Sequence, residues 1–189
     1  MFKDMVKATR SFRTFDSSVS IGRDELYDMI DTARLTASAM NRQPLLYVPL
    51  EKENTKRILK YTRWAAALDI KLPPEGGVPT AFVLMCTDFD KTPETPYLKV
   101  DAGIAAQTLL LAATEKGYGG CILASIDREG IKKELGLSER LEILLGIALG
   151  KPDEKIVLEE AINGECKYYR DENGHHVPKR PLADIVIDV

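Results

Sequence analysis

Apolar residues recur at helical spacing in the first part of the chain. One stripe falls at i, i+3, i+4 and i+7 and consists of Leu26, Met29, Ile30 and Ala33. This spacing predicts an amphipathic helix over residues 23–36. Asp24 and Glu25 would lie in its first turn, where the helix dipole favours acidic side chains. Residues 2–9 and 51–68 are also predicted to be helical.

A helix that is apolar on nearly every side is predicted over residues 101–116. Its apolar positions are Ile104, Ala105, Ala106, Leu109, Leu110, Leu111, Ala112 and Ala113. Such a helix is buried on more than one face. We therefore expect it to pack against the sheet on one side and against a partner subunit on another. Lys116 and Gly117 form a typical C-terminal signature.

Short apolar runs predict the strands of one sheet. They cover residues 45–50, 81–86, 121–126 and 141–149. Between the last two, Asp127 is a plausible N-cap and Gly136 a plausible end for a helix over residues 127–136. Residues 71–79 contain three Pro and two Gly and are predicted to be a loop.

The pattern of apolar residues that predicts helices and strands weakens after Gly150. Residues 151–177 are charged and predict no regular element, whereas the alternation over residues 182–189 is typical of an edge or exchanged strand. Helices and strands do not alternate strictly, and no repeat or linker divides the chain. We therefore predict one α+β domain over residues 1–189, with a central, mostly antiparallel or mixed sheet flanked by helices.

Composition narrows the class of protein. The net charge of −3 gives no support for a nucleic-acid partner, and no apolar run reaches the length of a membrane span. The first residues lack the apolar core of a signal peptide. Cys86, Cys121 and Cys166 are widely spaced and odd in number, which favours free thiols over a disulfide framework. These features predict a reduced, cytoplasmic protein.

Two short stretches carry candidate binding chemistry. Arg10, Ser11 and Arg13 place two guanidiniums and a hydroxyl close together, which is either a phosphate or flavin cradle or an exposed basic edge. Residues 37–44 begin with three small residues, continue with side-chain amides at Asn41 and Gln43, and end in Pro44. Asn41 in that stretch is either a ligand contact or a turn residue.

Two other motifs are less informative. Residues 117–120 are rich in glycine but follow a helix, so the dinucleotide fingerprint does not apply and a tight turn is favoured. His175 and His176 are adjacent but have no acidic residue at zincin spacing, so no metal site is predicted. Near the end, Lys179 and Arg180 place two cations between prolines.

Six motifs in order resemble the nitroreductase family. They are the R-S-x-R-x-F start, the S-A-x-N-x-Q-P turn, the Asp-x-Gly-x-Ala-Ala-Gln helix at 101–107, the Gly-Tyr-Gly-Gly-Cys turn, the Gly-Ile-Ala-Leu-Gly-Lys-Pro segment at 146–152 and the terminal Lys-Arg-Pro-Leu. The resemblance spans nearly the whole chain. It implies a homodimer with FMN bound between the subunits, and NADH or NADPH as the electron donor.

The resemblance also implies which residues contact FMN. Arg10, Ser11 and Arg13 would hold its phosphate, ribityl chain or pyrimidine edge, and Ser38 and Asn41 would contact it from the partner subunit. Leu123, Ala124 and Ser125 would lie along the isoalloxazine, with a backbone amide near N5. Lys179 or Arg180 would close on the phosphate. No catalytic side chain is implied, because the flavin carries the chemistry.

This chain departs from the family pattern at three places. Thr9 stands where many members have a second Arg, and Leu45 stands where many have Trp. Ala124 and Ser125 stand where many have Gly or Glu-Gly, so side chains there would narrow the approach to the ring.

The implied activity is a ping-pong transfer of hydride from NAD(P)H through FMN to a nitroaromatic or quinone-like acceptor. Two alternatives stay open. One is a specialised flavoenzyme of the same family, acting in dehalogenation, azoline oxidation or flavin breakdown. The other is a flavin-binding protein without turnover.

Overall fold

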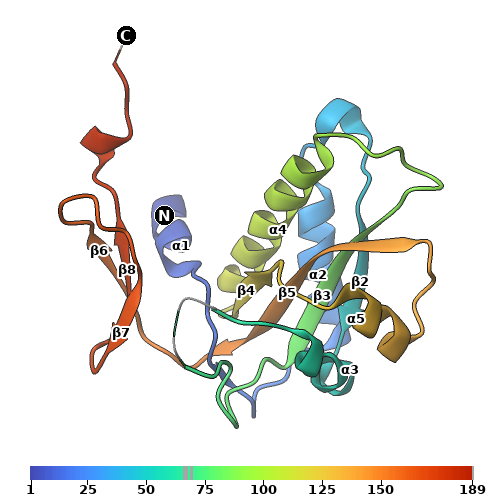
Figure 1. Ribbon diagram of the computed structural model, residues 1–189, viewed down its shortest axis with the longest axis horizontal. Coiled ribbons are helices and arrows are strands. Elements are labelled where there is room, and N and C mark those ends of the chain that lie inside the picture. Colours follow the sequence, from blue (N-terminus) through green and yellow to red (C-terminus); the bar gives the residue numbers. More distant parts are fainter. Residues whose placement is uncertain (66–67, 69, 189) are drawn as a thin grey trace. The chain divides into compact units, whose positions relative to one another are not determined.

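The computed structural model describes residues 1–65, 68 and 70–188 (Figure 1). Contacts divide the chain into two compact units, Met1–Pro152 and Asp153–Val189, here called unit 1 and unit 2. Each unit is described by itself, so the single domain over residues 1–189 stays a prediction. No helix among the described residues is long and apolar enough to cross a membrane.

Unit 1 is built on one antiparallel sheet. Its strands are β1 (Phe15–Asp16), β2 (Leu46–Leu50), β3 (Ala81–Asp88), β4 (Gly119–Leu123) and β5 (Leu141–Pro152). They run in the order β1-β5-β3-β2, and β4 also pairs with β5. The β5 strand is long enough to hold β3 along one edge, and both β1 and β4 along the other. This arrangement confirms the predicted α+β class.

Helices cover both faces of this sheet. They are α1 (Phe2–Ala8), α2 (Arg23–Arg34), α3 (Lys52–Ile58), α4 (Leu98–Glu115) and α5 (Arg128–Leu135), with short 3-10 helices η1 (Ala39–Asn41) and η2 (Leu59–Tyr61). The predicted caps of α5 are confirmed. Asp127 accepts a hydrogen bond from the amide of Gly130, and Gly136 ends the helix at φ 64°.

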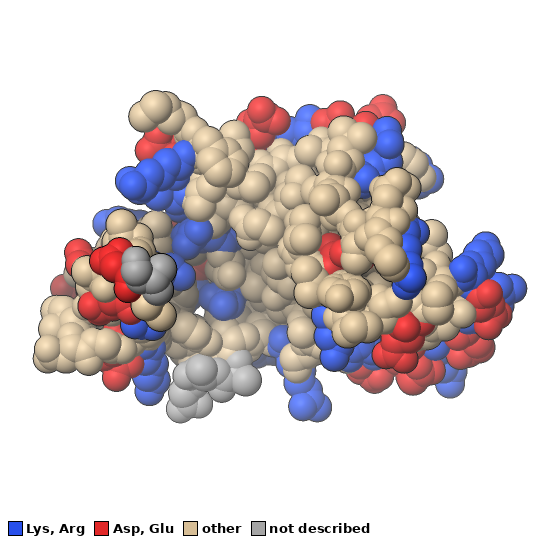
Figure 2. All heavy atoms as spheres, turned by 90° about the horizontal axis from the view of Figure 1, so that it is seen from above, with Lys and Arg blue, Asp and Glu red and all other residues tan. Residues whose placement is uncertain are grey.

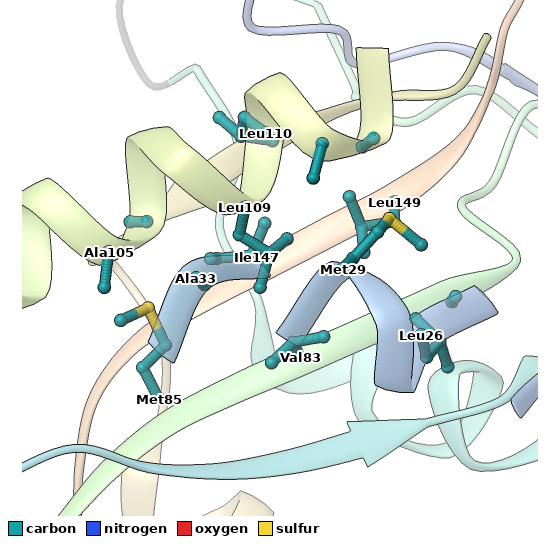
Figure 3. Close-up of a cluster of buried hydrophobic side chains, with 14 of the residues drawn as sticks. Leu26, Met29, Ala33, Val83, Met85, Ala105, Leu109, Leu110, Ile147 and Leu149 are labelled. Carbon is teal, nitrogen blue, oxygen red and sulfur yellow. The ribbon is translucent and has the colours of Figure 1, made fainter. Parts of the chain in front are cut away.

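All eight residues of β3 are buried, and their alternation separates two cores. Val83 and Met85 face α2 and α4, whereas Phe82 and Leu84 belong to the core that includes α3 and α5. Figure 3 shows side chains of α2, α4, β3 and β5 meeting in the first core. A strand covered on both faces favours apolar residues on both sides, which explains the continuous apolar run from Ala81 to Cys86.

The predicted helix over residues 51–68 is too long. The α-helix ends at Ile58, and η2 continues it only to Tyr61. Thr62 then turns into extended backbone at ψ 144°, and its hydroxyl donates to the carbonyl of Leu59. Thr62 also pairs with Ile126, so this tertiary pairing overrides the helical pattern. Residues 66 and 67 of the prediction lie outside the described residues.

Unit 2 contains strands that the sequence did not predict. They are β6 (Ile156–Glu160), β7 (Tyr169–Asp171) and β8 (Gly174–Lys179). Strand β8 is central, parallel to β6 and antiparallel to β7. Several side chains of these strands are exposed, and the charged residues at such positions interrupt the apolar pattern that would have predicted the strands.

The strand predicted over residues 182–189 is wrong for the single chain. Leu182–Asp184 form a 3-10 helix, η3, and residues 185–188 pair with no strand among the described residues. Apolar alternation alone cannot make a strand, because the backbone groups of a strand need a neighbour to bond. The last residue of that prediction, Val189, lies outside the described residues.

One histidine ties the three strands of unit 2 together. His176 of β8 lies 2.9 Å through Nδ1 from Glu159 of β6, and 2.9 Å through Nε2 from Asp171 of β7. Its ring stacks on Tyr169. The hydrogen bond to Glu159 raises the pKa of His176 above 6.5, and Asp171 adds to this effect. Both ring nitrogens can donate only in the imidazolium form.

Unit 2 should therefore lose stability as the pH rises. The folded-state pKa of His176 is raised, so its contribution is complete below pH 6.5 and disappears as the pH passes through the raised pKa. Urea unfolding and the ring NMR signals of His176, both followed from pH 6 to pH 9, would measure this. His176→Gln should flatten the dependence. A wild-type free energy of unfolding that rises across this range would contradict the assignment.

Candidate functional site

The N-terminal segment is anchored to α4 by a buried threonine. Thr9 follows α1, and its hydroxyl donates to the carbonyl of Met5 at 2.8 Å. The same oxygen lies 2.9 Å from the hydroxyl of Thr114 near the end of α4. At this departure from the family pattern, Thr9 therefore has a structural role, because it fixes where the following arginines begin.

Arg10 is half-buried beside this anchor. Its Nη2 donates to the carbonyl of Val6 at 2.8 Å, which folds the side chain back along α1. Its Nε is fully buried and has no hydrogen-bond partner among the described residues. Burial lowers the pKa of Arg10. A buried donor without an acceptor is costly, so this guanidinium is suited to an anionic ligand that completes its hydrogen bonds.

Ser11 and Arg13 continue along the edge of β4. Ser11 pairs with Gly120 in a parallel bridge, and the amide of Phe12 donates to the carbonyl of Gly120 at 3.0 Å. Nη1 of Arg13 donates to the carbonyl of Ser11 at 3.3 Å, so the guanidinium bends back over the segment. On its other side β4 packs tightly against β5, since a Cβ on Gly120 would clash with the carbonyl oxygen of Ala148.

The same edge strand leads to the residues expected beside the flavin ring. Leu123 is buried and packs in the core, so only its backbone is available to a ligand. Ala124 and Ser125 follow it and are exposed. At about 3.3 Å per residue, Ala124 lies about 13 Å from Gly120 along the strand. One edge therefore carries both the arginine segment and the exposed strand end.

Arg128 holds this strand end in place. It is the first residue of α5, and its Nη2 donates to the carbonyls of Ala124 at 3.3 Å and Leu144 at 3.2 Å. Its Nε donates to the carbonyl of Ile143 at 2.7 Å. The register of β3 against β5 shifts at this point, which leaves Leu144 as the extra residue of a bulge.

The loop that contains Ser38 and Asn41 has an unusual backbone. Met40 and Asn41 both have φ 53°, and Gln43 has φ 48°. Three left-handed residues without glycine in so short a stretch store conformational strain, which is typical of functional sites. The hydroxyl of Ser38 accepts a hydrogen bond from the amide of Gln43 at 3.1 Å. Asn41 is exposed.

One chain does not bring the two halves of the expected flavin site together. The amide of Ala39, beside Ser38, bonds to Asp101 near the start of α4, whereas Thr9, beside Arg10, bonds to Thr114 near its end. A helix rises about 1.5 Å per residue, so these two contacts lie about 20 Å apart along α4.

Lys179 and Arg180 belong to unit 2. Lys179 ends β8, where its carbonyl accepts a hydrogen bond from the amide of Ala161 at 2.8 Å. The guanidinium of Arg180 donates to the carbonyl of Asp184. The positions of the two units relative to each other are not determined. The closing of Lys179 or Arg180 on the FMN phosphate therefore stays a prediction.

A cavity of about 1020 Å³ in unit 1 borders the exposed strand end. Ala124 and Arg128 form part of its wall, together with apolar residues of β5, the first turns of α4 and the connection before α4. This volume is large enough for a substrate-sized molecule.

Two residues of the site escaped the sequence analysis. Asp101 was noted only within a motif, and Arg128 was not singled out at all. Both bind backbone groups of distant segments. Asp101 accepts a hydrogen bond from the amide of Ala39, and Arg128 donates to the carbonyls of Ala124 and of Ile143 in β5. The pattern of side chains along the sequence does not reveal contacts with distant backbone groups. The charge of Asp101 at the start of an apolar helix was nevertheless a usable signal for such a contact.

A family model described as the nitroreductase family matches residues 6–151. The match covers most of the chain, so the chain belongs to the nitroreductase family. The resemblance found in the six motifs is thereby confirmed.

Curated relatives match most of the chain. YodC of Bacillus subtilis, a provisionally named NAD(P)H nitroreductase, is 24% identical over 177 residues, which covers 78% of this chain and 88% of YodC. The CLA biosynthesis enone reductase of Lactiplantibacillus plantarum is 28% identical over 187 residues, with 78% and 84% covered.

Solved structures share the fold. A provisionally named nitroreductase from Desulfovibrio desulfuricans, crystallised in complex with FMN, matches with a TM-score of 0.71 at 20% identity. The match covers 99% of this chain and 95% of that chain. Both units therefore have counterparts in a known flavoprotein fold.

Proposed function

We propose that this protein is an FMN-dependent oxidoreductase that uses NADH or NADPH to reduce a nitroaromatic or quinone-like acceptor. The observation that carries the proposal is the arginine segment on the edge of β4, where the buried Nε of Arg10 finds no acceptor in the described part of the chain. Membership of the nitroreductase family and the FMN in a structural neighbour support it.

The residues present are suited to FMN. Arg10, Ser11 and Arg13 would supply guanidinium and hydroxyl donors to the phosphate, ribityl chain or pyrimidine edge. When bound, FMN would supply the hydride-transfer chemistry between NAD(P)H and the acceptor. A guanidinium fixed near N1 and O2 would stabilise the negative charge that develops there. Exposed backbone at Ala124 and Ser125 would face the ring.

We further propose that the active form is a homodimer. The two ends of α4 carry different halves of the site, so Ser38 and Asn41 of the partner subunit would complete the site begun by Arg10–Arg13. Two copies with their α4 helices antiparallel would form two such sites. Tyr97, Val100 and Ile104 lie exposed at helical spacing along α4 and offer an apolar surface for this contact. In Figure 2 the middle of the view, over α4 and the end of α2, is largely free of charged side chains.

The free thiols are consistent with a reducing, cytoplasmic location of the protein. Cys86, Cys121 and Cys166 form no disulfide, and two of them are buried. Burial raises the pKa of Cys86 to about 12, which keeps this thiol protonated and unreactive.

A second acceptor class is the enone, a carbon–carbon double bond conjugated to a carbonyl. The cavity beside Ala124 is largely lined by apolar residues and is large enough for an extended acceptor. One relative is named as an enone reductase.

The first experiment is the absorption spectrum of the freshly purified protein, followed by heat release and identification of the chromophore. We expect a yellow protein with about one FMN per chain. Anaerobic NADH or NADPH should bleach it, and nitroaromatic, quinone and enone acceptors should each be tested for reoxidation. Parallel double-reciprocal plots would support a ping-pong order. FMN binding without bleaching would indicate a flavin-binding protein without turnover, and failure to bind FMN would refute the proposal.

A further inference from the structure

The turn that presents Ser38 and Asn41 is poorly supported by packing. Met40 is 71% exposed, and a cavity of about 280 Å³ borders the turn, with Ser38 and Gln43 in its wall. Left-handed backbone at residues other than glycine relaxes readily unless its surroundings hold it. Some specific interaction must therefore keep this turn in place.

Asp101 supplies that interaction. Its carboxylate is 5% exposed, and Oδ1 accepts a hydrogen bond from the amide of Ala39 at 3.0 Å. The other hydrogen bonds of residues 37–43 join residues of the same segment, such as Ser38 to Asn41 and Ser38 to Gln43. Among the described residues, this bond is the one that links the segment to the rest of the chain.

We propose that Asp101 is a positioning residue for the flavin site. It fixes the amide of Ala39 and thereby holds Ser38 and Asn41 in the strained turn from which they reach the FMN bound to the partner subunit. The inference rests on the proposed function, because it needs FMN to be the ligand. Asp101 lies on the first turns of α4, and the apolar body of that helix is buried, so the carboxylate has a rigid base.

Asp101→Leu and Asp101→Asn form the main comparison. Both side chains nearly match the shape of aspartate, but only Asn retains an acceptor oxygen. Dissociation constants for FMN, from fluorescence titration of the apoprotein, and the visible circular dichroism of bound flavin would be measured. We expect Asp101→Leu to weaken FMN binding at least tenfold and to change the dichroism. We expect Asp101→Asn to stay within threefold of wild type.

A matched control comes from Asp88, a second buried aspartate among the described residues. Asp88 is 6% exposed, and its Oδ1 also caps a backbone amide, that of Asp90 at 3.1 Å. Asp88→Ala should lower the free energy of unfolding, yet it should leave FMN binding within threefold of wild type. Asp101→Ala serves as a second variant without an acceptor if Asp101→Leu does not fold.

The outcomes separate this inference from the proposed function. Failure of the wild-type protein to bind FMN would refute both. Wild-type binding together with a folded Asp101→Leu or Asp101→Ala variant that binds FMN equally well would overturn only the role of Asp101. Equal weakening by Asp101→Asn and Asp101→Leu would also overturn it, because the acceptor oxygen would then not matter.

Discussion

Replacing Arg13 with alanine is expected to weaken FMN binding by about 1.5–3 kcal/mol, the range for a hydrogen bond to a charged group. This corresponds to a loss of roughly one to two orders of magnitude in affinity. Arg13 follows the segment that pairs with β4, and Nη1 of its guanidinium donates to the carbonyl of Ser11 at 3.3 Å. A phosphate or a reduced flavin would offer this guanidinium shorter, charge-assisted hydrogen bonds.

The measurement is FMN retention through dialysis, followed by a fluorescence titration of the apoprotein. Arg57→Ala is a suitable control, because Arg57 is half exposed and pairs with Glu134 between α3 and α5, away from β4. Arg13→Lys should recover only part of the affinity, since an ammonium lacks the planar fork of donors. An Arg13→Ala protein that keeps its flavin as wild type does would show that Arg13 is not a ligand.

Ile104→Asp is expected to break the dimer and release FMN together. Ile104 is 41% exposed in the single chain and belongs to the apolar stripe along α4. A carboxylate buried in the proposed interface without a partner would cost about 3–5 kcal/mol. In the proposed dimer each site would take donors from segments at opposite ends of two α4 helices, so a monomer would retain only part of its contacts to the flavin.

Analytical ultracentrifugation and flavin content would be read on the same samples. Ile104→Leu keeps the surface apolar and should remain a dimer with full FMN content. A stable Ile104→Asp dimer would place the interface elsewhere on the molecule. A monomer that still holds one FMN per chain would show that Ser38 and Asn41 of the partner subunit are not needed.

Two charged residues hold backbone segments of the proposed site in place. Asp101 holds a backbone amide of the strained turn, and Arg128 holds the carbonyls at the end of β4 and in the β5 bulge. Neither is expected to touch the flavin. Substitutions that alter flavin binding in this protein need not therefore lie in contact with the flavin.

Much of the fold follows from local pattern. The stripe of Leu26, Met29 and Ala33 is fully buried, as helical spacing predicts, and the continuous apolar run of β3 is covered on both faces. Apolar periodicity reports burial, and burial in unit 1 is governed by one sheet with helices on both faces. The α+β class and the family were therefore accessible from the sequence.

The errors arise where a distant partner decides the local structure. The helix after β2 stops early because Thr62 pairs with Ile126, and the apolar alternation after Pro181 forms no strand in the single chain. The strands of unit 2 went unpredicted because their charged residues mask the pattern, although His176 joins all three through two carboxylates.

The sequence by itself determined the class of fold and the family, and it indicated the candidate donors near the N-terminus, because these depend on residue types at fixed spacing. Only the tertiary structure decided that the arginine segment pairs with β4, and that Thr9 and Ala39 contact α4 at points about 20 Å apart along the helix. It also revealed the bond from Asp101 to Ala39. Contacts between backbone groups and distant side chains carry no signature in sequence order, since they form only when the chain has folded.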